Sequence, residues 1–259
     1  MKKQTMLLSY SLLFLCLLHV YSCTKLPPHF DPADAGNVYN GCRVKKITNY
    51  HQIRVFEYNN NNDPVSISNS LLGTGNPAMA FKYDNKKRLI QYAANYAEGV
   101  GFEILHKYGY SQNRISTDTV YLLGGYDLNG QPVHYFDKRL AYLQYDDLNR
   151  VAQDSMISLR SPGPFAVITK YNYDQAGNLL YTNGEVISNI QYDNKLNPHR
   201  TNKIWMFIDL NYSVNNPGKA TTYNSADLPL PYNPGAGVYG LRFAGLNVSD
   251  SSQLEYDCK

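Results

Sequence analysis

The sequence has little of what long helices and charge-driven binding require. Only five of its 259 residues are glutamate and only one is tryptophan, and glutamate is among the residues that favour helices. The 24 basic and 21 acidic residues leave a formal net charge of +3. So small an excess excludes a nucleic-acid binder that relies on bulk positive charge.

Motifs of catalysis and of metal binding are also missing. The sequence has no Gly-x-Ser-x-Gly, no His-Glu-x-x-His and no phosphate-binding loop, which argues against the enzyme classes that carry these motifs. It has no Cys-x-x-Cys pair and its six histidines are scattered, so we expect neither a metal site nor a cofactor. Because catalytic side chains can converge from distant strands, an enzyme stays open as an alternative.

Tyrosine and asparagine are abundant, with 24 and 27 residues. Tyrosine favours strands and asparagine favours turns. The composition therefore predicts an all-β fold with negligible helix beyond the N-terminal segment.

Residues 1–22 have the features of a secretory signal peptide. Two lysines precede an apolar run over residues 6–18, which is long enough for a signal-peptide core but short for a membrane span. The segment Val20–Cys23 reads Val-Tyr-Ser-Cys and resembles the bacterial lipobox. The resemblance implies cleavage before Cys23 and acylation of that residue, so that lipid chains hold the protein on a bilayer. An ordinary secretory peptide with a chance cysteine is the alternative.

A tether and a single folded domain follow the signal peptide. Residues 23–39 are rich in proline and lack periodicity, which predicts a tether. A single β domain is expected over residues 40–259. Cys42 and Cys258 lie near the two ends of that domain. In an oxidising location they could form a disulfide, and two free thiols are the alternative.

The dipeptide Tyr-Asp recurs more often than the composition explains. Random placement of these residues gives roughly one or two copies, whereas the sequence holds six. Their spacing is uneven, which favours an irregular meander over a solenoid. The copies are Tyr83-Asp84, Tyr126-Asp127, Tyr145-Asp146, Tyr173-Asp174, Tyr192-Asp193 and Tyr256-Asp257.

Each copy predicts a strand, a tight turn and a returning strand. The aspartate begins the turn by accepting a hydrogen bond from the backbone N–H two residues on. The third residue after it suits a positive φ, and Gly130, Asn149 and Gly177 occupy that position because these residue types tolerate it best. Lys87 stands there in the first copy, which predicts a strained or differently built turn. The segment Val55–Asn62 looks like a degenerate copy with asparagine in place of aspartate.

The cleanest copy, Tyr173–Leu179, resembles the core of the YD repeat of RHS-type shells. The chain is also similar to a set of Bacteroidota lipoproteins of unknown function, whose rolled antiparallel sheets have been called porin-like. Tyr192–Pro198 resembles their Tyr-Asp-x-Lys-x-Asn-Pro element. Over about residues 40–215 the resemblance implies an antiparallel meander of hairpins that forms a large curled sheet or half-barrel. It implies no activity.

Four segments depart from the repeat. Residues 93–105 could hold one helical turn, and the long loops after residue 215 are expected to carry any specific site. The apolar run 204–208 contains the tryptophan and predicts either a core plug beneath the sheet or an exposed aromatic anchor. Tyr256-Asp257 begins a unit with no returning strand, so either the hairpin stops at a sheet edge or the reading frame is truncated, and we favour truncation.

These features predict a non-catalytic scaffold or binding protein of the bacterial cell envelope, anchored to the membrane by lipid at the outer membrane. A glycan or other envelope polymer and an envelope protein are the expected partners, and nucleic acid is not. The tyrosines could stack on sugar rings or form cross-strand ladders. Two alternatives are an envelope glycan hydrolase with a carboxylate pair from separate strands and a fragment of an RHS-type shell.

Overall fold

The computed structural model describes residues 38–39, 41–97, 100–159, 165–182, 185–186, 191–218, 220–232, 242–247 and 252–259. The chain divides into Met1–Asp31 and Pro32–Lys259, and every described residue belongs to the second unit. The expected signal peptide and the expected lipidation site Cys23 lie outside the described residues. Within the described ranges no helix is long and apolar enough to span a membrane.

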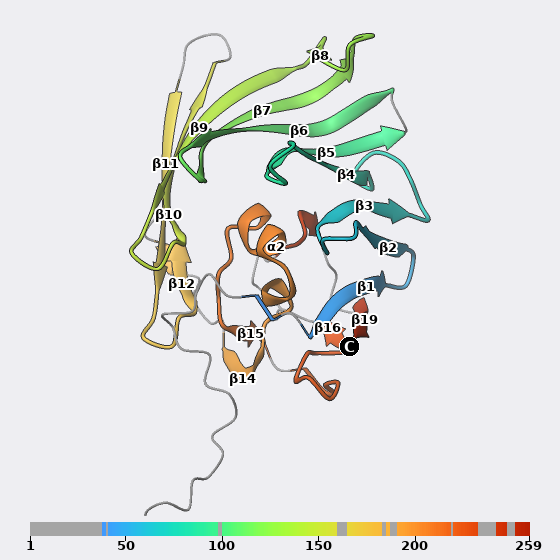
Figure 1. The fold of residues 1–259 in the computed structure, drawn as a ribbon, viewed down its shortest axis with the longest axis vertical. Coiled ribbons are helices and arrows are strands. Elements are labelled where there is room, and N and C mark those ends of the chain that lie inside the picture. Colours follow the sequence, from blue (N-terminus) through green and yellow to red (C-terminus); the bar gives the residue numbers. More distant parts are fainter. Residues whose placement is uncertain are drawn as a thin grey trace, which may run out of the picture. The chain divides into compact units, whose positions relative to one another are not determined.

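One antiparallel sheet of 15 strands forms most of the second unit (Figure 1). From β1 to β13 almost every strand pairs with its neighbours in the sequence, which confirms the predicted meander. The strands are β1 (Cys42–Thr48), β2 (Ile53–Tyr58), β3 (Pro64–Asn69), β4 (Ala78–Tyr83), β5 (Leu89–Ala97), β6 (Gly101–Ser111), β7 (Arg114–Tyr126), β8 (Pro132–Val133), β9 (Asp137–Tyr145), β10 (Val151–Ser158), β11 (Phe165–Tyr173), β12 (Leu179–Thr182), β13 (Glu185–Val186), β16 (Pro231–Tyr232) and β19 (Ser252–Cys258).

The sheet curls around a small plug (Figure 1). The plug consists of the 3-10 turn η2 (Pro198–Thr201), the short helix α2 (Lys203–Ile208), the ribbon of β14 (Tyr192–Leu196) and β15 (Asn215–Pro217), and the ribbon of β17 (Arg242–Phe243) and β18 (Leu246–Asn247). The large sheet runs from β13 at one edge to β16 at the other, and these edges do not pair among the described residues. The part of the chain that the structure describes is therefore mostly antiparallel β with almost no helix, as the composition predicted.

Trp205 lies at the centre of the core. Its side chain is fully buried, and its ring lies 5.6 Å from that of Phe56 and 5.6 Å from that of Phe81, measured between centroids. Phe243 of β17 packs against the same ring at 6.0 Å. The predicted core plug is therefore confirmed, and the alternative of an exposed aromatic anchor is wrong.

Asn202 fixes the start of the plug helix. Its side-chain oxygen accepts a hydrogen bond from the N–H of Ile204 at 2.9 Å, which satisfies one of the donors that a helix N-terminus leaves free. Its side-chain nitrogen donates to the carbonyl of Asn62 at 2.9 Å. The same residue thus caps α2 and joins it to the turn between β2 and β3.

Two expectations about strand order need correction. The described part of residues 93–105 belongs to β5 and β6 rather than to a helical turn, because cross-strand pairing satisfies the backbone of both segments. Tyr256-Asp257 is not an unpaired half-unit, since β19 pairs with β1 on one side and β16 on the other. A disulfide joins Cys42 of β1 to Cys258 of β19 across this pairing.

Candidate functional site

Four of the predicted turns share one geometry. In each, the N–H of the aspartate donates to the carbonyl four residues on, and the third residue after the aspartate donates back to the aspartate carbonyl. That third residue has a φ between 61° and 81° in all four turns. Lys87 has a φ of 61°, so its turn is built like the others and the expectation of a different construction is wrong. The turns are Tyr83–Leu89, Tyr126–Pro132, Tyr145–Val151 and Tyr173–Leu179.

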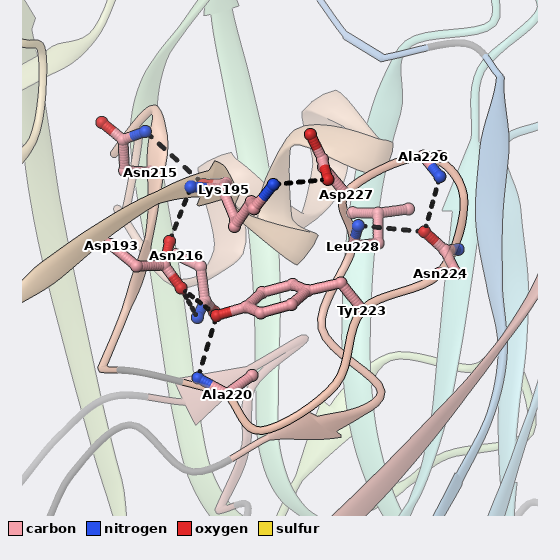
Figure 2. Close-up of polar contacts among 10 residues, drawn as sticks. All are labelled: Asp193, Lys195, Asn215, Asn216, Ala220, Tyr223, Asn224, Ala226, Asp227 and Leu228. Atoms are coloured by element: carbon pink, nitrogen blue, oxygen red, sulfur yellow. Dashed lines mark hydrogen bonds and ion pairs between the residues drawn. The ribbon is translucent and has the colours of Figure 1, made fainter.

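Asparagine replaces aspartate in two more turns of this kind. The side-chain oxygen of Asn59 accepts hydrogen bonds from the N–H groups of Asn61 and Asp63, as predicted for the degenerate copy. Asn224 makes the same contacts with Ala226 and Leu228 (Figure 2). The Tyr-Asp pattern does not include this second copy, but Tyr223-Asn224 repeats the Tyr58-Asn59 pair of the degenerate copy.

Tyr192-Asp193 makes only the first contact of the predicted repeat turn: the Asp193 carboxylate accepts a hydrogen bond from the N–H of Lys195 at 2.7 Å, but the backbone bonds that close the other turns do not form here. Asp193 lies in β14, where its carboxylate accepts hydrogen bonds from the Tyr223 hydroxyl at 2.5 Å and the Asn216 amide at 3.0 Å (Figure 2). The third residue after Asp193 is Leu196, a side chain that resists positive φ. The chain therefore continues as a strand, and Asp193 joins β14 to β15 and to the loop that holds Tyr223.

Tyrosine hydroxyls, three of them from Tyr-Asp pairs and one from Tyr110, join strands next to the repeat turns. In four cases the hydroxyl donates to a backbone carbonyl just after an earlier turn, at 2.7–2.9 Å. The accepting residue always lies six positions after the tyrosine of that earlier turn. Such a bond satisfies a backbone acceptor that would otherwise be left over at a strand start. These hydroxyls are therefore engaged in the sheet rather than offered to a ligand. The pairs are Tyr83 with Pro64, Tyr110 with Leu89, Tyr192 with Leu179 and Tyr256 with Pro229.

We expect Gly130→Ala to lower the free energy of unfolding by about 1–2 kcal/mol, because a Cβ at positive φ is strained. Gly130 has a φ of 72° and an added Cβ would meet no other atom within 4 Å, so strain alone would act. Gly73→Ala is the matched control, since its Cβ also meets nothing but its φ is not positive. Urea unfolding of both variants checks this, and equal midpoints would contradict it.

A cavity of about 460 Å³ lies between the sheet and the plug. Its walls come from β4 to β7, β9 and β10, from the end of α2 and from the turn between β17 and β18. Alternate residues of a strand face one side, and His106 and Tyr108 of β6 both line the cavity. Cavities of about 300–1,000 Å³ are typical of ligand sites. We refer to this cavity as the cleft.

His106 and Asp118 are in hydrogen-bond contact in the cleft. Nδ1 of His106 lies 2.7 Å from Oδ2 of Asp118 on the neighbouring strand. The other carboxylate oxygen, Oδ1, is buried and accepts no hydrogen bond from the described residues. A hydrogen bond from a ligand to this buried acceptor would remove the cost of leaving it unpaired and would favour binding.

Asp154 supplies a second carboxylate on β10. Burial raises its pKa above the usual value and the nearby charge of Asp118 adds to the rise, whereas hydrogen bonds from Tyr171 and Thr169 oppose it. The Tyr171 hydroxyl donates to Oδ2 of Asp154 at 2.9 Å. Asp154 therefore keeps its proton at a higher pH than a free aspartate does.

Aromatic rings and arginines complete the lining. The His106 ring lies between those of Tyr92 and Tyr108, with centroids 5.4 Å and 6.0 Å away. Arg54 and Arg242 also line the cleft. It thus combines hydrogen-bond acceptors, fixed cations and flat apolar surface in one place.

None of the expected site residues that the structure describes lies in this cleft. The repeat turns lie at strand ends, and the cleft is formed by strand centres and the plug. The sequence contains a pattern that points to the cleft. His106 and Asp118 are polar, whereas Ile104 and Val120, each two residues away on the same strand face, are apolar. The described residues contain no group of three or more metal-ligating side chains.

No protein-family model matches this chain, and no curated protein shows significant similarity to it.

Proposed function

We propose that the chain is a lipid-anchored protein of the bacterial cell envelope that binds a glycan or another envelope polymer without catalysis. The observation that carries the binding role is the cleft, in which Asp118, Arg242 and the Tyr92 ring converge. Sugar hydroxyls form strong hydrogen bonds with charged groups, and sugar rings pack on aromatic side chains. The lining therefore suits a saccharide better than a purely apolar ligand.

The envelope location is supported by two features. One is the lipobox-like segment Val20–Cys23, which predicts attachment at the outer membrane. The other is the disulfide between Cys42 and Cys258, since such bonds persist in oxidising compartments and are rare in the cytosol.

A glycan hydrolase is the second candidate, and one observation favours it. Asp118 and Asp154 come from separate strands and line the same cleft, and the pKa of Asp154 is raised by burial. Glycosidases use two carboxyl groups whose environments differ in this way, one as an acid and one as a base or nucleophile.

A glycan array that includes peptidoglycan fragments, probed with the full chain in a polyoxyethylene detergent, tests both candidates. We expect saturable binding without turnover. Asp118→Asn should weaken that binding roughly 10–100-fold, as expected for the loss of a hydrogen bond to a charged group worth about 1.5–3 kcal/mol.

Asp147→Asn is the matched control, because Asp147 is exposed in a turn outside the cleft and the substitution removes the same charge. Equal effects of the two variants would contradict the assignment of binding to the cleft. Turnover that Asp154→Asn abolishes would overturn the non-catalytic role in favour of the hydrolase.

A further inference from the structure

A second pocket, of about 400 Å³, lies at the end of the sheet where the repeat turns are. It is lined by the β4–β5 turn, the β6–β7 turn and the β9–β10 turn, and by the first turn of α2. Leu89, Ile115 and Phe207 form part of its apolar floor. We refer to it as the turn pocket.

The lining of the turn pocket contains five cations and no carboxylate. Arg88 is neutralised by Asp84, whose Oδ2 lies 2.7 Å from the guanidinium. The other four are exposed and make no ion pair within 4.0 Å among the described residues. They are Lys86, Lys87, Arg114 and Lys203. Because the chain as a whole is nearly balanced in charge, this local excess is a property of the pocket.

Two of the cations lie over tyrosine rings of the pocket. The guanidinium carbon of Arg88 lies 4.3 Å from the centre of the Tyr110 ring, and that of Arg114 lies 5.5 Å from the centre of the Tyr145 ring. A guanidinium stacked on a ring is held in place while its N–H edge stays free to bind a carboxylate or phosphate in two-pronged fashion. Arg114 is thus positioned before any ligand arrives, whereas the Nε and Nη2 groups of Arg88 already bind Asp84.

We propose that the turn pocket binds the anionic group of an acidic saccharide. The cations at its rim would bind a carboxylate or phosphate, and the apolar floor would contact the attached sugar ring. This site is separate from the cleft and does not depend on the role proposed for the cleft, although Phe207 lines both.

The test is calorimetric titration of the full chain in a polyoxyethylene detergent with four probes: an oligogalacturonate, glucose 6-phosphate, a neutral maltooligosaccharide and inorganic phosphate. We expect saturable binding of at least one acidic sugar. The double variant Arg114→Gln/Lys203→Gln should weaken it at least about tenfold, since charge-assisted contacts are the strong ones. Raising the salt concentration should weaken it further because exposed charges are screened.

Lys45→Gln/Lys170→Gln is the matched control, since both lysines are exposed and lie outside the pocket. The unfolding midpoint of each double variant shows whether it is folded. Equal weakening by the two double variants, binding of neither acidic sugar, or inorganic phosphate that binds more tightly than both would overturn the proposal. Binding of a neutral glycan in the cleft should not change in Arg114→Gln/Lys203→Gln, so failure of one site is distinguishable from failure of the other.

Discussion

Replacing Trp205 with alanine is expected to lower the free energy of unfolding by about 3–5 kcal/mol, the usual cost of removing a large buried aromatic side chain. The Trp205 side chain is fully buried, and its ring contacts Phe56, Phe81 and Phe243 from three different parts of the fold. Its loss would leave a cavity where the sheet meets the plug. Urea unfolding followed by far-ultraviolet circular dichroism measures the change, since the only tryptophan is the residue removed.

Two variants show that burial is the cause. Trp205→Phe keeps most of the ring contacts and should cost less than Trp205→Ala. Tyr50→Ala removes an aromatic ring that is 88% exposed and should change the free energy of unfolding by no more than about 0.5 kcal/mol. A loss below about 1 kcal/mol for Trp205→Ala would contradict the central position of this residue.

Removal of the disulfide with Cys42→Ala/Cys258→Ala is expected to cost about 4–5 kcal/mol. The bond joins residues 216 positions apart, and a cross-link that closes so long a loop removes much of the conformational entropy of the unfolded chain. Alanine is preferred to serine at these positions because Cys42 is buried and a hydroxyl there would lose its hydration. Equilibrium unfolding in urea measures the loss.

Wild-type chain unfolded in the presence of a reducing agent should match the double variant. The agreement would show that the bond itself, and not the change of side chains, is responsible. An unchanged midpoint after reduction would contradict a stabilising role for this disulfide.

The sequence predicted those parts of the fold that depend on a few consecutive residues. The turn at Tyr173–Leu179 needs an acceptor side chain, a residue that tolerates positive φ and apolar flanks, and all three can be recognised locally. The same rule explains the failure at Asp193, because Leu196 occupies the position that needs positive φ. It also explains the missed turn at Asn224, where Asp227 has a φ of 60°.

The cleft could not be predicted in this way. His106 and Asp154 are brought together only by the curling of several strands over the plug. Local patterns define which face of each strand a residue occupies, but they do not say which strands end up opposite α2. The expectation that specific sites lie in the loops after residue 215 covers only part of the cleft lining, namely Arg242, Gly245 and Leu246, and not the strand residues.

The pairing of β1 with β19 sets the order in which the sheet can be completed. The hairpins from β2 onward close short loops and can form one after another, whereas the β1–β19 ladder must wait for a segment about 200 residues away. Folding rates fall as contacts become more distant in sequence, so we expect this ladder to form after the hairpins. Until it forms, one edge of β1 lacks its partner strand, and an open strand edge is where chains associate wrongly. By covering this edge of β1, β19 therefore also protects it from pairing with other chains.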